Sequence, residues 1–460
     1  MDLSKIQKIL IIGLGPRTGV AASNFLARKG YAVVVSDSKD RAALTDALAA
    51  LDRGVRVIAG AQRPELLDEG FDLAVLSPGV PRAIPLVAAA VERGVPVVSE
   101  IELAYRFAKG LIVAITGTDG KTTTTSLVGH ILAALGIDTF VGGNIGVPFV
   151  SFVDRTRDSS VTVLELSSFQ LETIDRFRPD VAAILNIAPD HLDRYATMDE
   201  YVDAKMRIAM NQRADDAFVF FADDALIRSR LGAVVARTCG FAVRDTVAAI
   251  RFDGSMVRLA GVDAPVLDPT RMRIIGVHNV QNAMAAILMV RAVLARMGRP
   301  ADDGAIAEAI YSFKGLPHRM EIVGEFEGRT FINDSKATTV NAVEMALASL
   351  TRPAVLILGG RTKGDDYARL NGPIAQRVKR LLLIGESTPE FARLFAAHDP
   401  VPVATLEEAL AQAMRHSAPG DAVLYSPATA SFDMFRNYEE RGDRFRETFQ
   451  RLVRGEVAWT

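Results

Sequence analysis

The sequence is poor in the residue types that build disulfide frameworks and cysteine-rich metal sites. It has one cysteine, Cys239, and six histidines in 460 residues, so both kinds of site are excluded. We expect Cys239 to be a buried or idle thiol. No apolar run approaches the roughly 20 residues that a membrane-spanning helix needs. The net charge of −2 gives no general attraction to nucleic acid or to an anionic membrane.

The N-terminus also lacks the pattern of a signal peptide, because residues 1–5 lead directly into an apolar strand. We therefore expect a protein of a reducing compartment, most simply the cytoplasm, with no nucleic-acid partner and no membrane insertion.

What the chain does have is length and apolar content. Its 460 residues, 49% of them hydrophobic, are enough for about three domains with their own cores.

The segment 117–123, GTDGKTT, is the stretch around which the chain is organised. It follows an apolar strand at 111–115 and precedes apolar residues at helical spacing from 127 to 135. Backbone N–H groups and the positive end of the helix dipole therefore converge on a glycine-rich turn, which suits a phosphate chain. Lys121 would face the outer phosphates, and the hydroxyl of Thr122 or Thr123 would reach Mg²⁺. The full phosphate-loop pattern requires a glycine where this chain has Ile115, so a helix start with a solvated lysine is the alternative.

The N-terminal segment has the pattern of a nucleotide-binding βαβ unit. A strand from residue 8 ends in a glycine turn at 13–19, a helix follows over 18–28, and a second strand over 32–35 ends at Asp37. An acidic residue at that place can hold a ribose hydroxyl. The glycine spacing is one residue longer than the dinucleotide fingerprint, so a turn that only lets helix and strand approach each other is also possible. A third strand, 73–76, runs into the loop 77–81, at the edge where such sheets bind ligands.

Two further strands place polar residues beside the phosphate loop. Glu165 stands at the tip of the strand 161–164, where a nucleotide-bound Mg²⁺ is usually held, although a glutamate there could simply be exposed. The strand 181–187 leads to His191, which two aspartates flank, and this favours a ligand or metal role. The glycine-rich loop 141–146 carries the amide of Asn144 and suits close approach by a ligand.

Other residues carry weaker signals. Lys205 lies on one helix face with Tyr201, but spacing alone does not distinguish it from a solvated lysine. Residues 215–275 are expected to be β-rich and without chemistry. Asn279 and Asn282 lie three apart near the start of an apolar helix at 283–297, where they would serve either as caps or as part of a site.

The C-terminal part predicts a third α/β unit. Its strands at 329–332, 355–358, 381–384 and 422–425 each run into polar or glycine-rich sequence, so a binding site is expected at the carboxyl edge of this sheet. Asp334 and Lys336 lie at that edge, where a functional role is favoured over a surface ion pair. We expect domains over 1–99, 100–315 and 316–460, with a hinge near Gly315 about which the third closes.

Taken together, these stretches resemble the Mur ligase family over nearly the whole chain. The resemblance is carried by motifs that recur in order at 117–122, 142–146, 165–170, 190–195, 315–319, 333–338 and 426–433. It implies an α/β protein with a Rossmann-like UDP-binding domain, a central P-loop-type ATPase domain and a Rossmann-like C-terminal domain. It departs from the commonest family form in the longer first glycine turn and in Asp119, where asparagine is frequent.

The resemblance also implies an activity. The protein would be an ATP-dependent amide ligase that adds D-glutamate to UDP-N-acetylmuramoyl-L-alanine through an acyl phosphate, in the synthesis of the peptidoglycan precursor. ATP, two Mg²⁺ ions and a CO₂-derived carbamate on Lys205 would be required. The enzyme is expected to act as a monomer.

The family's functional residues can be placed on this sequence. The UDP substrate would be held by Gly15, Thr18, Asp37, Ser38, Lys39, Ser77, Gly79 and Asn144. ATP would be held by Gly117, Thr118, Asp119, Gly120, Lys121, Thr122, Thr123, Asn279, Asn282, Arg319 and Asp334. Metal ligands would be Thr122, Glu165, His191 and carbamylated Lys205, glutamate would be received by Lys336, Thr338, Lys363, Ser431, Phe432 and Tyr438, and the catalytic residues would be Lys121, His191, Lys205 and Lys336.

Three alternatives are open, one from the same superfamily and two from other classes of protein. Another ligase of the same superfamily, such as a folylpolyglutamate synthetase, would share the phosphate loop. A dehydrogenase would use the N-terminal glycine turn and would have to bind NAD. A nucleotide-binding switch or scaffold would bind ATP without needing the polar edge of the third domain.

Overall fold

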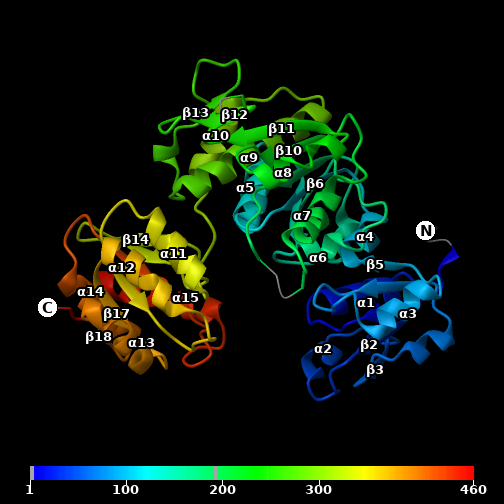
Figure 1. Ribbon diagram of the computed structural model, residues 1–460, viewed down its shortest axis with the longest axis horizontal. Coiled ribbons are helices and arrows are strands. Elements are labelled where there is room, and N and C mark those ends of the chain that lie inside the picture. Colours follow the sequence, from blue (N-terminus) through cyan, green and yellow to red (C-terminus); the bar gives the residue numbers. More distant parts are fainter. Residues whose placement is uncertain (1–4, 191–193, 246, 460) are drawn as a thin grey trace. The chain divides into compact units, whose positions relative to one another are not determined.

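The computed structural model describes residues 5–190, 194–245 and 247–459. The described part of the chain forms three β-sheets with helices packed on them (Figure 1). It divides into two compact units. The first contains Met1–Pro269 and Gln281–Ile310, and the second contains Thr270–Val280 and Tyr311–Thr460. This α/β organisation is the fold class predicted from the sequence.

The first sheet of unit 1 is parallel throughout, in the order β3-β2-β1-β4-β5. Its strands are β1 (Lys8–Ile12), β2 (Ala32–Asp37), β3 (Arg56–Ala59), β4 (Leu73–Leu76) and β5 (Val97–Ser99), and its helices are α1 (Thr18–Arg28), α2 (Thr45–Ala49) and α3 (Pro85–Glu92). Successive residues of β1 point to opposite faces. Ile9 and Ile11 join the cluster that contains Phe25 of α1, and Leu10 joins the cluster that contains Leu86 of α3. The sheet is therefore buried on both faces, as parallel sheets are.

The second sheet of unit 1 has the order β13-β12-β11-β10-β9-β6-β8-β7. Its strands are β6 (Leu111–Thr116), β7 (Thr139–Gly143), β8 (Val161–Glu165), β9 (Val181–Ile184), β10 (Ala217–Phe221), β11 (Arg237–Ala242), β12 (Ile250–Phe252) and β13 (Val257–Leu259). Only the pairing of β12 with β13 is antiparallel among these strands as described. Because β6 lies between β8 and β9, the segments that follow these three strands meet at one edge.

The helices of this part are α4 (Glu100–Tyr105), α5 (Lys121–Ala134), α6 (Ser168–Leu171), α7 (Met198–Met206), α8 (Ala225–Arg228), α9 (Val277–Arg296) and α10 (Asp303–Ser312). In the described residues, α9 is the one helix long and apolar enough to cross a membrane by length and composition. Its most apolar stretch is 78% buried inside the protein, which is the environment of a core helix.

Several boundaries differ from those expected. Gly142 and Gly143 belong to strand β7 rather than to a loop, and they pair with β8. A Cβ on Gly142 would lie 2.5 Å from the ring of Phe152, so glycine serves close packing here rather than a turn. Strand β9 ends at Ile184, three residues early, and α9 begins at Val277, six residues early.

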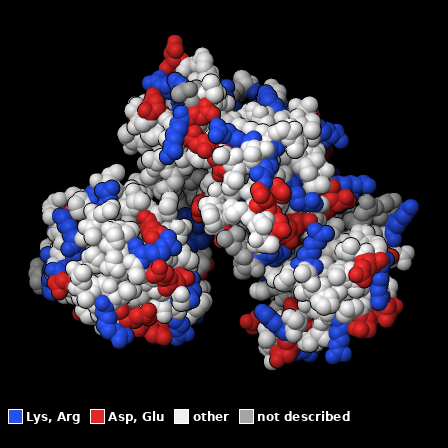
Figure 2. Space-filling model, in the orientation of Figure 1, with Lys and Arg blue, Asp and Glu red and all other residues white. Residues whose placement is uncertain are grey.

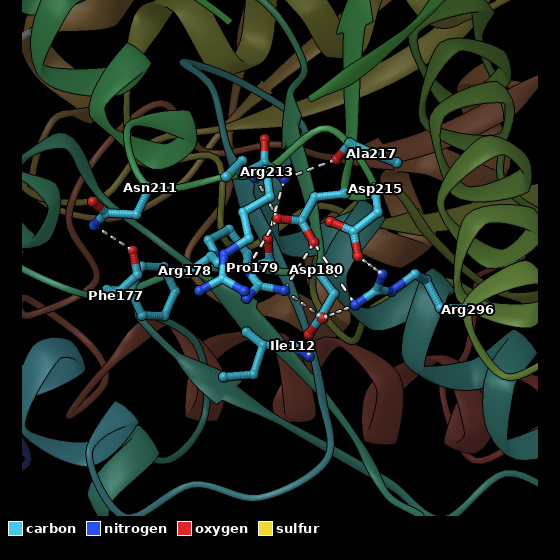
Figure 3. A network of polar contacts seen from close by, with 12 residues as sticks. Ile112, Phe177, Arg178, Pro179, Asp180, Asn211, Arg213, Asp215, Ala217 and Arg296 are labelled. Atoms are coloured by element: carbon cyan, nitrogen blue, oxygen red, sulfur yellow. Dashed lines mark hydrogen bonds and ion pairs between the residues drawn. The ribbon is translucent and has the colours of Figure 1, made fainter. Parts of the chain in front are cut away.

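A polar network stabilises the amino ends of strands in the second sheet (Figure 3). Asp216 is buried and accepts from the Arg178 guanidinium at 3.0 and 3.1 Å. Arg296, at the end of α9, pairs with Asp215 and donates to Asp180, and Asp180 also accepts the Ile112 N–H at 2.9 Å. The network lies at the amino ends of β6 and β9. It therefore connects the sheet to α9 at the end opposite to the phosphate loop.

The sheet of unit 2 has the order β14-β15-β19-β16-β17-β18. Its strands are β14 (Glu321–Phe326), β15 (Arg329–Asn333), β16 (Ala354–Leu358), β17 (Val378–Leu383), β18 (Val401–Pro402) and β19 (Ala422–Tyr425), and its helices are α11 (Val340–Ser349), α12 (Asn371–Arg377), α13 (Thr388–Leu394), α14 (Leu406–His416) and α15 (Tyr438–Val453). All described pairings are parallel except that of β14 with β15. Leu356 faces the cluster that includes α11, and Val355 faces the cluster that includes α14 and α15.

The surface agrees with the small net charge. Figure 2 shows acidic and basic side chains interspersed over the face that it draws, without a large area of one sign. That face offers no basic stripe of the kind that tracks a nucleic-acid backbone.

Candidate functional site

The glycine-rich segment after β6 adopts the geometry of a phosphate-binding turn. Gly117 has φ +149° and Gly120 has φ +80°, and α5 begins directly afterwards at Lys121. A Cβ on Gly120 would lie 2.4 Å from Oδ1 of Asn282, and one on Gly117 would lie 3.1 Å from the Leu185 side chain. Both the backbone conformation and the close neighbours therefore require glycine.

Lys121 and its neighbours are held by backbone groups. Its ammonium donates to the carbonyls of Gly117 (3.0 Å) and Thr118 (2.6 Å). Asn186, which follows β9, accepts the Asp119 N–H at 2.8 Å and donates to the Asp119 carbonyl at 3.1 Å. Asp119 itself is exposed. Asn186, which the predicted strand 181–187 delivers to this edge of the sheet, therefore holds the loop through its side-chain amide.

Glu165 stands beside this loop as predicted, and it is buried rather than exposed. The residue is 3% exposed, and its Oε1 accepts from the Asn144 amide at 3.0 Å. Its Oε2 is buried without a hydrogen-bond partner in the described structure. A buried carboxylate oxygen with an open coordination position fits an oxygen-preferring cation such as Mg²⁺.

Lys205 projects from α7 into the same region. It is 2% exposed, and its Nζ donates to the Gly117 carbonyl at 2.7 Å and lies 4.5 Å from the centre of the Tyr201 ring. Burial, and then the positive charge of Lys121, lowers the pKa of Lys205 to about 7. The neutral amine is therefore well populated near neutral pH, and a neutral amine is the form that reacts with CO₂.

His191 and Asp193 lie outside the described residues. Within the described ranges, no three histidine, cysteine, aspartate or glutamate side chains gather as a metal site. Thr122 is half-buried and Thr123 is buried in the first turn of α5, which places them next to Lys121. The donor set around the loop is thus a carboxylate, threonine hydroxyls and a buried lysine.

The first glycine turn is tied to the ends of β2 and β4. Asp37 is buried and accepts the N–H groups of Leu14 (2.6 Å) and Lys39 (2.8 Å). Ser77 donates to the Gly13 carbonyl at 2.7 Å. Asp37 therefore organises the turn with both of its oxygens. The other residues predicted to hold the UDP substrate are half-buried or exposed. They are Gly15, Thr18, Ser38, Lys39, Gly79 and Asn144.

In unit 2 the polar segments meet at the carboxyl edge of β15, β16 and β19. Asp334 is 5% exposed and accepts from the Met320 N–H (3.0 Å) and the Ser426 hydroxyl (2.7 Å). Burial raises the pKa of Asp334 to about 7, against the lowering effect of these donors and of Arg319. Lys336 lies 5.9 Å from the ring of Tyr438.

The remaining residues predicted to receive glutamate differ in exposure. Ser431 is 2% exposed and Phe432 is 64% exposed. Thr338 is half-buried and Lys363 is exposed. Asn279, at the start of α9, donates its side-chain N–H to the Ile275 carbonyl at 2.7 Å.

Arg441 is a residue that sequence reasoning missed. It is 1% exposed although it lies on the charged helix α15. Its guanidinium donates to the Ser335 hydroxyl and carbonyl at 3.0 and 2.8 Å and to the Thr429 carbonyl at 3.0 Å. It therefore joins the two polar loops that follow β15 and β19. A charged helix gives no sequence signal that one of its arginines is buried.

Three family models together match most of the chain. The Mur ligase MurD-like N-terminal domain matches residues 7–99, the Mur ligase middle domain 115–290, and the Mur ligase glutamate ligase domain 318–429. A protein of Geobacter metallireducens named UDP-N-acetylmuramoylalanine–D-glutamate ligase is 45% identical, with 98% of each chain covered. The chain belongs to the Mur ligase family. A protein of the same name from Pelotomaculum thermopropionicum is 41% identical, again with 98% of each chain covered.

Solved structures of other Mur ligases share the fold. The MurC ligase of Thermotoga maritima matches with a TM-score of 0.59 at 23% identity, over 96% of this chain and 99% of that chain. The MurF ligase of the same organism, solved with ADP, matches with a TM-score of 0.57 at 16% identity, over 99% and 100%. The predicted family and three-domain α/β fold class are thereby confirmed. The individual site residues and the domain boundaries stay predictions.

Proposed function

We propose that this protein is an ATP-dependent ligase that joins D-glutamate to UDP-N-acetylmuramoyl-L-alanine in the synthesis of the peptidoglycan precursor. The observation that carries the proposal is the phosphate loop flanked by buried Glu165 and Lys205, in a chain whose full-length relatives bear the name of that ligase. We also propose that it works in the cytoplasm as a monomer.

ATP would bind at residues 117–123. The N–H groups at the start of α5 would face its phosphates, and Lys121 would exchange its carbonyl contacts for the outer phosphate oxygens. Thr118, Asp119 and Gly120 would complete the loop. Asn279 and Asn282 would lie on the adenine side, and Arg319 and Asp334 would contribute from the third domain.

Two Mg²⁺ ions would be held by Thr122, Glu165, His191 and carbamylated Lys205. When bound, they would offset the negative charge that develops as the phosphoryl group is transferred. The Oε2 of Glu165, which has no hydrogen-bond partner among the described residues, supports this assignment. The burial and lowered pKa of Lys205 support its carbamylation, because they supply the neutral amine for that reaction. The carbamate would be a carboxylate-like ligand in place of a buried cation.

The reaction would have two steps. A carboxylate oxygen of the UDP substrate attacks the γ-phosphorus of ATP, and the bond from that phosphorus to the bridging oxygen breaks. The products are an acyl phosphate and ADP. The amine of D-glutamate then attacks the acyl carbon, loses a proton and expels phosphate. Lys121 would stabilise the charge of the first step, and Lys336, Thr338, Lys363, Ser431, Phe432 and Tyr438 would position the amino acid for the second.

Phosphate release tests the proposal directly. The protein is incubated with ATP, Mg²⁺ and UDP-N-acetylmuramoyl-L-alanine, with no amino acid, with D-glutamate or with L-glutamate. Release that requires both the UDP substrate and D-glutamate is expected. Preference for L-glutamate would keep the mechanism and change the substrate. Release without dependence on the UDP substrate would remove the proposed role of the first domain.

A further inference from the structure

Glu172, immediately after α6, is a half-buried acceptor that the proposed chemistry does not use. Its side chain is 15% exposed. Its Oε1 accepts the hydroxyl of Tyr195 at 2.6 Å, and its Oε2 accepts Nη2 of Arg194 at 3.0 Å. Arg194 and Tyr195 end the 190–195 motif, in which only His191 was given a role. The carboxylate therefore fixes both side chains at the end of that motif.

Arg194 in turn connects three segments of the predicted site. Its guanidinium lies 3.9 Å from the centre of the Phe169 ring, in the segment that follows Glu165. It also donates to the Pro78 carbonyl at 3.4 Å, inside the loop predicted to hold the UDP substrate. The Glu172 carbonyl accepts from Arg82 of the same stretch at 3.5 Å. Since a guanidinium is planar and rigid, its orientation depends on the carboxylate and the ring that hold it.

Tyr195 extends the connection toward the phosphate loop. Its ring lies 5.4 Å from that of Tyr201, and the Tyr201 hydroxyl lies 3.1 Å from the Thr118 hydroxyl. Tyr195 is buried, with 7% exposed. A packed and hydrogen-bonded path therefore runs from the Pro78 loop through Glu172 to the loop predicted to bind ATP.

We propose that Glu172, with Arg194 and Tyr195, is a positioning group that sets how tightly the protein binds its UDP substrate. It acts by fixing the 77–79 loop against the central domain, and it touches neither substrate in this arrangement. The inference rests on the proposed function. Without the carboxylate, Arg194 loses the one ionic partner that it has among the described residues, in a largely buried place. It would therefore turn toward water and release the Pro78 carbonyl.

The test is Glu172→Gln, with KM measured separately for the UDP substrate and for ATP. Glutamine keeps an acceptor for Tyr195 and removes the ion pair with Arg194. We expect the KM for the UDP substrate to rise at least fivefold, while the KM for ATP changes less than twofold. Tyr195→Phe removes only the hydroxyl and should give a smaller rise of the same kind. Equal UDP-substrate KM values in both variants and the wild type would overturn the proposal.

Two further variants separate positioning from general stability. Asp216→Asn breaks a buried ion pair with Arg178 at the far end of the sheet, so it should lower the melting midpoint without changing either KM. Glu172→Gln should lower the melting midpoint, because it leaves the Arg194 charge unpaired. The double variant Glu172→Gln/Arg194→Met removes that charge, so its melting midpoint should return toward the wild-type value while the KM for the UDP substrate stays raised. A KM that recovers with the midpoint, or a KM for ATP that rises equally, would overturn the proposal. The wild type is assayed first, because loss of UDP-substrate dependence there refutes the proposed function instead.

Discussion

At the scale of single residues, Gly120 is restricted both by its backbone conformation and by a close neighbour. Its φ of +80° costs an L-residue about 1–2 kcal/mol, and a Cβ would lie 2.4 Å from Asn282 Oδ1. We expect Gly120→Ala to raise the KM for ATP at least tenfold, because the loop must shift to relieve the overlap. Gly136→Ala is the matched control, since Gly136 has φ +73° with open space around it. It should lower stability similarly and leave the KM unchanged, and an equal KM effect in both variants would refute the explanation.

Lys205 carries the second prediction at this scale. Lys205→Ala should lower kcat by roughly 10²-fold or more, as loss of a group that stabilises developing charge does. If the lysine acts as a carbamate, bicarbonate or a short carboxylic acid should restore part of the activity. The exposed Lys109, before the amino end of β6, gives the control variant Lys109→Ala. Full activity in Lys205→Ala would remove the lysine from the metal site.

The same scale shows where sequence reasoning ends. Glu165 was predicted from its place at a strand tip, and the structure buries it beside the phosphate loop. Nothing in the spacing distinguished Lys205 from a solvated lysine, because its 2% exposure arises from the packing of α7 against other segments. The burial of Arg441 and the contacts between Asn186 and the loop were not predicted for the same reason, since both depend on contacts between distant segments.

At the scale of elements, the buried Glu100 at the start of α4 ties two segments together. It is 1% exposed, and its Oε1 accepts the Val150 N–H at 2.6 Å. Burial raises the pKa of Glu100 to about 7, although the N–H groups of Val150 and Phe149 oppose the rise. The folded protein therefore keeps a proton between pH 4.5 and about 7 that the unfolded chain has released. Raising the pH through this window lowers the free energy of unfolding.

Glu100→Gln tests this dependence. The variant lacks the titrating group, so the stability of the wild type relative to the variant should fall by the order of 3 kcal/mol between pH 5 and pH 8. Urea denaturation of both proteins at several pH values measures the difference. The exposed Glu92 provides the control variant Glu92→Gln, for which the difference should stay flat. If the difference between the wild type and Glu100→Gln does not change with pH, the pKa of Glu100 is not raised by burial.

The elements themselves were predicted unevenly, for a physical reason. The helix α1 and the strands β4 and β19 have the expected bounds, because continuous apolar runs mark buried parallel strands and periodic apolar residues mark helices. Strand β14 was missed because it is a half-buried edge strand with a broken pattern. Its signal was the hairpin turn Glu327-Gly328, in which both residues have positive φ, but this pair is not the common Asn-Gly signature.

At the scale of the whole molecule, we predict that the third domain closes on its substrates during the reaction. The amine of glutamate has to reach the acyl phosphate proposed to form at the central domain, and closure would supply that proximity. The predicted hinge near Gly315 has an unusual backbone, since Gly315, His318 and Met320 all have positive φ. Two non-glycine residues in that conformation within three positions indicate local strain.

Small-angle scattering tests the closure in solution. We expect the radius of gyration to fall when a non-hydrolysable ATP analogue, Mg²⁺ and UDP-N-acetylmuramoyl-L-alanine are all present, because only the full set supplies contacts that favour the closed form. The nucleotide alone and the UDP substrate alone are the controls, and each should give a smaller change. Identical scattering under all conditions would mean that the third domain does not move on binding. The residues proposed to bind the glutamate substrate would then have to be in their working positions before any substrate binds.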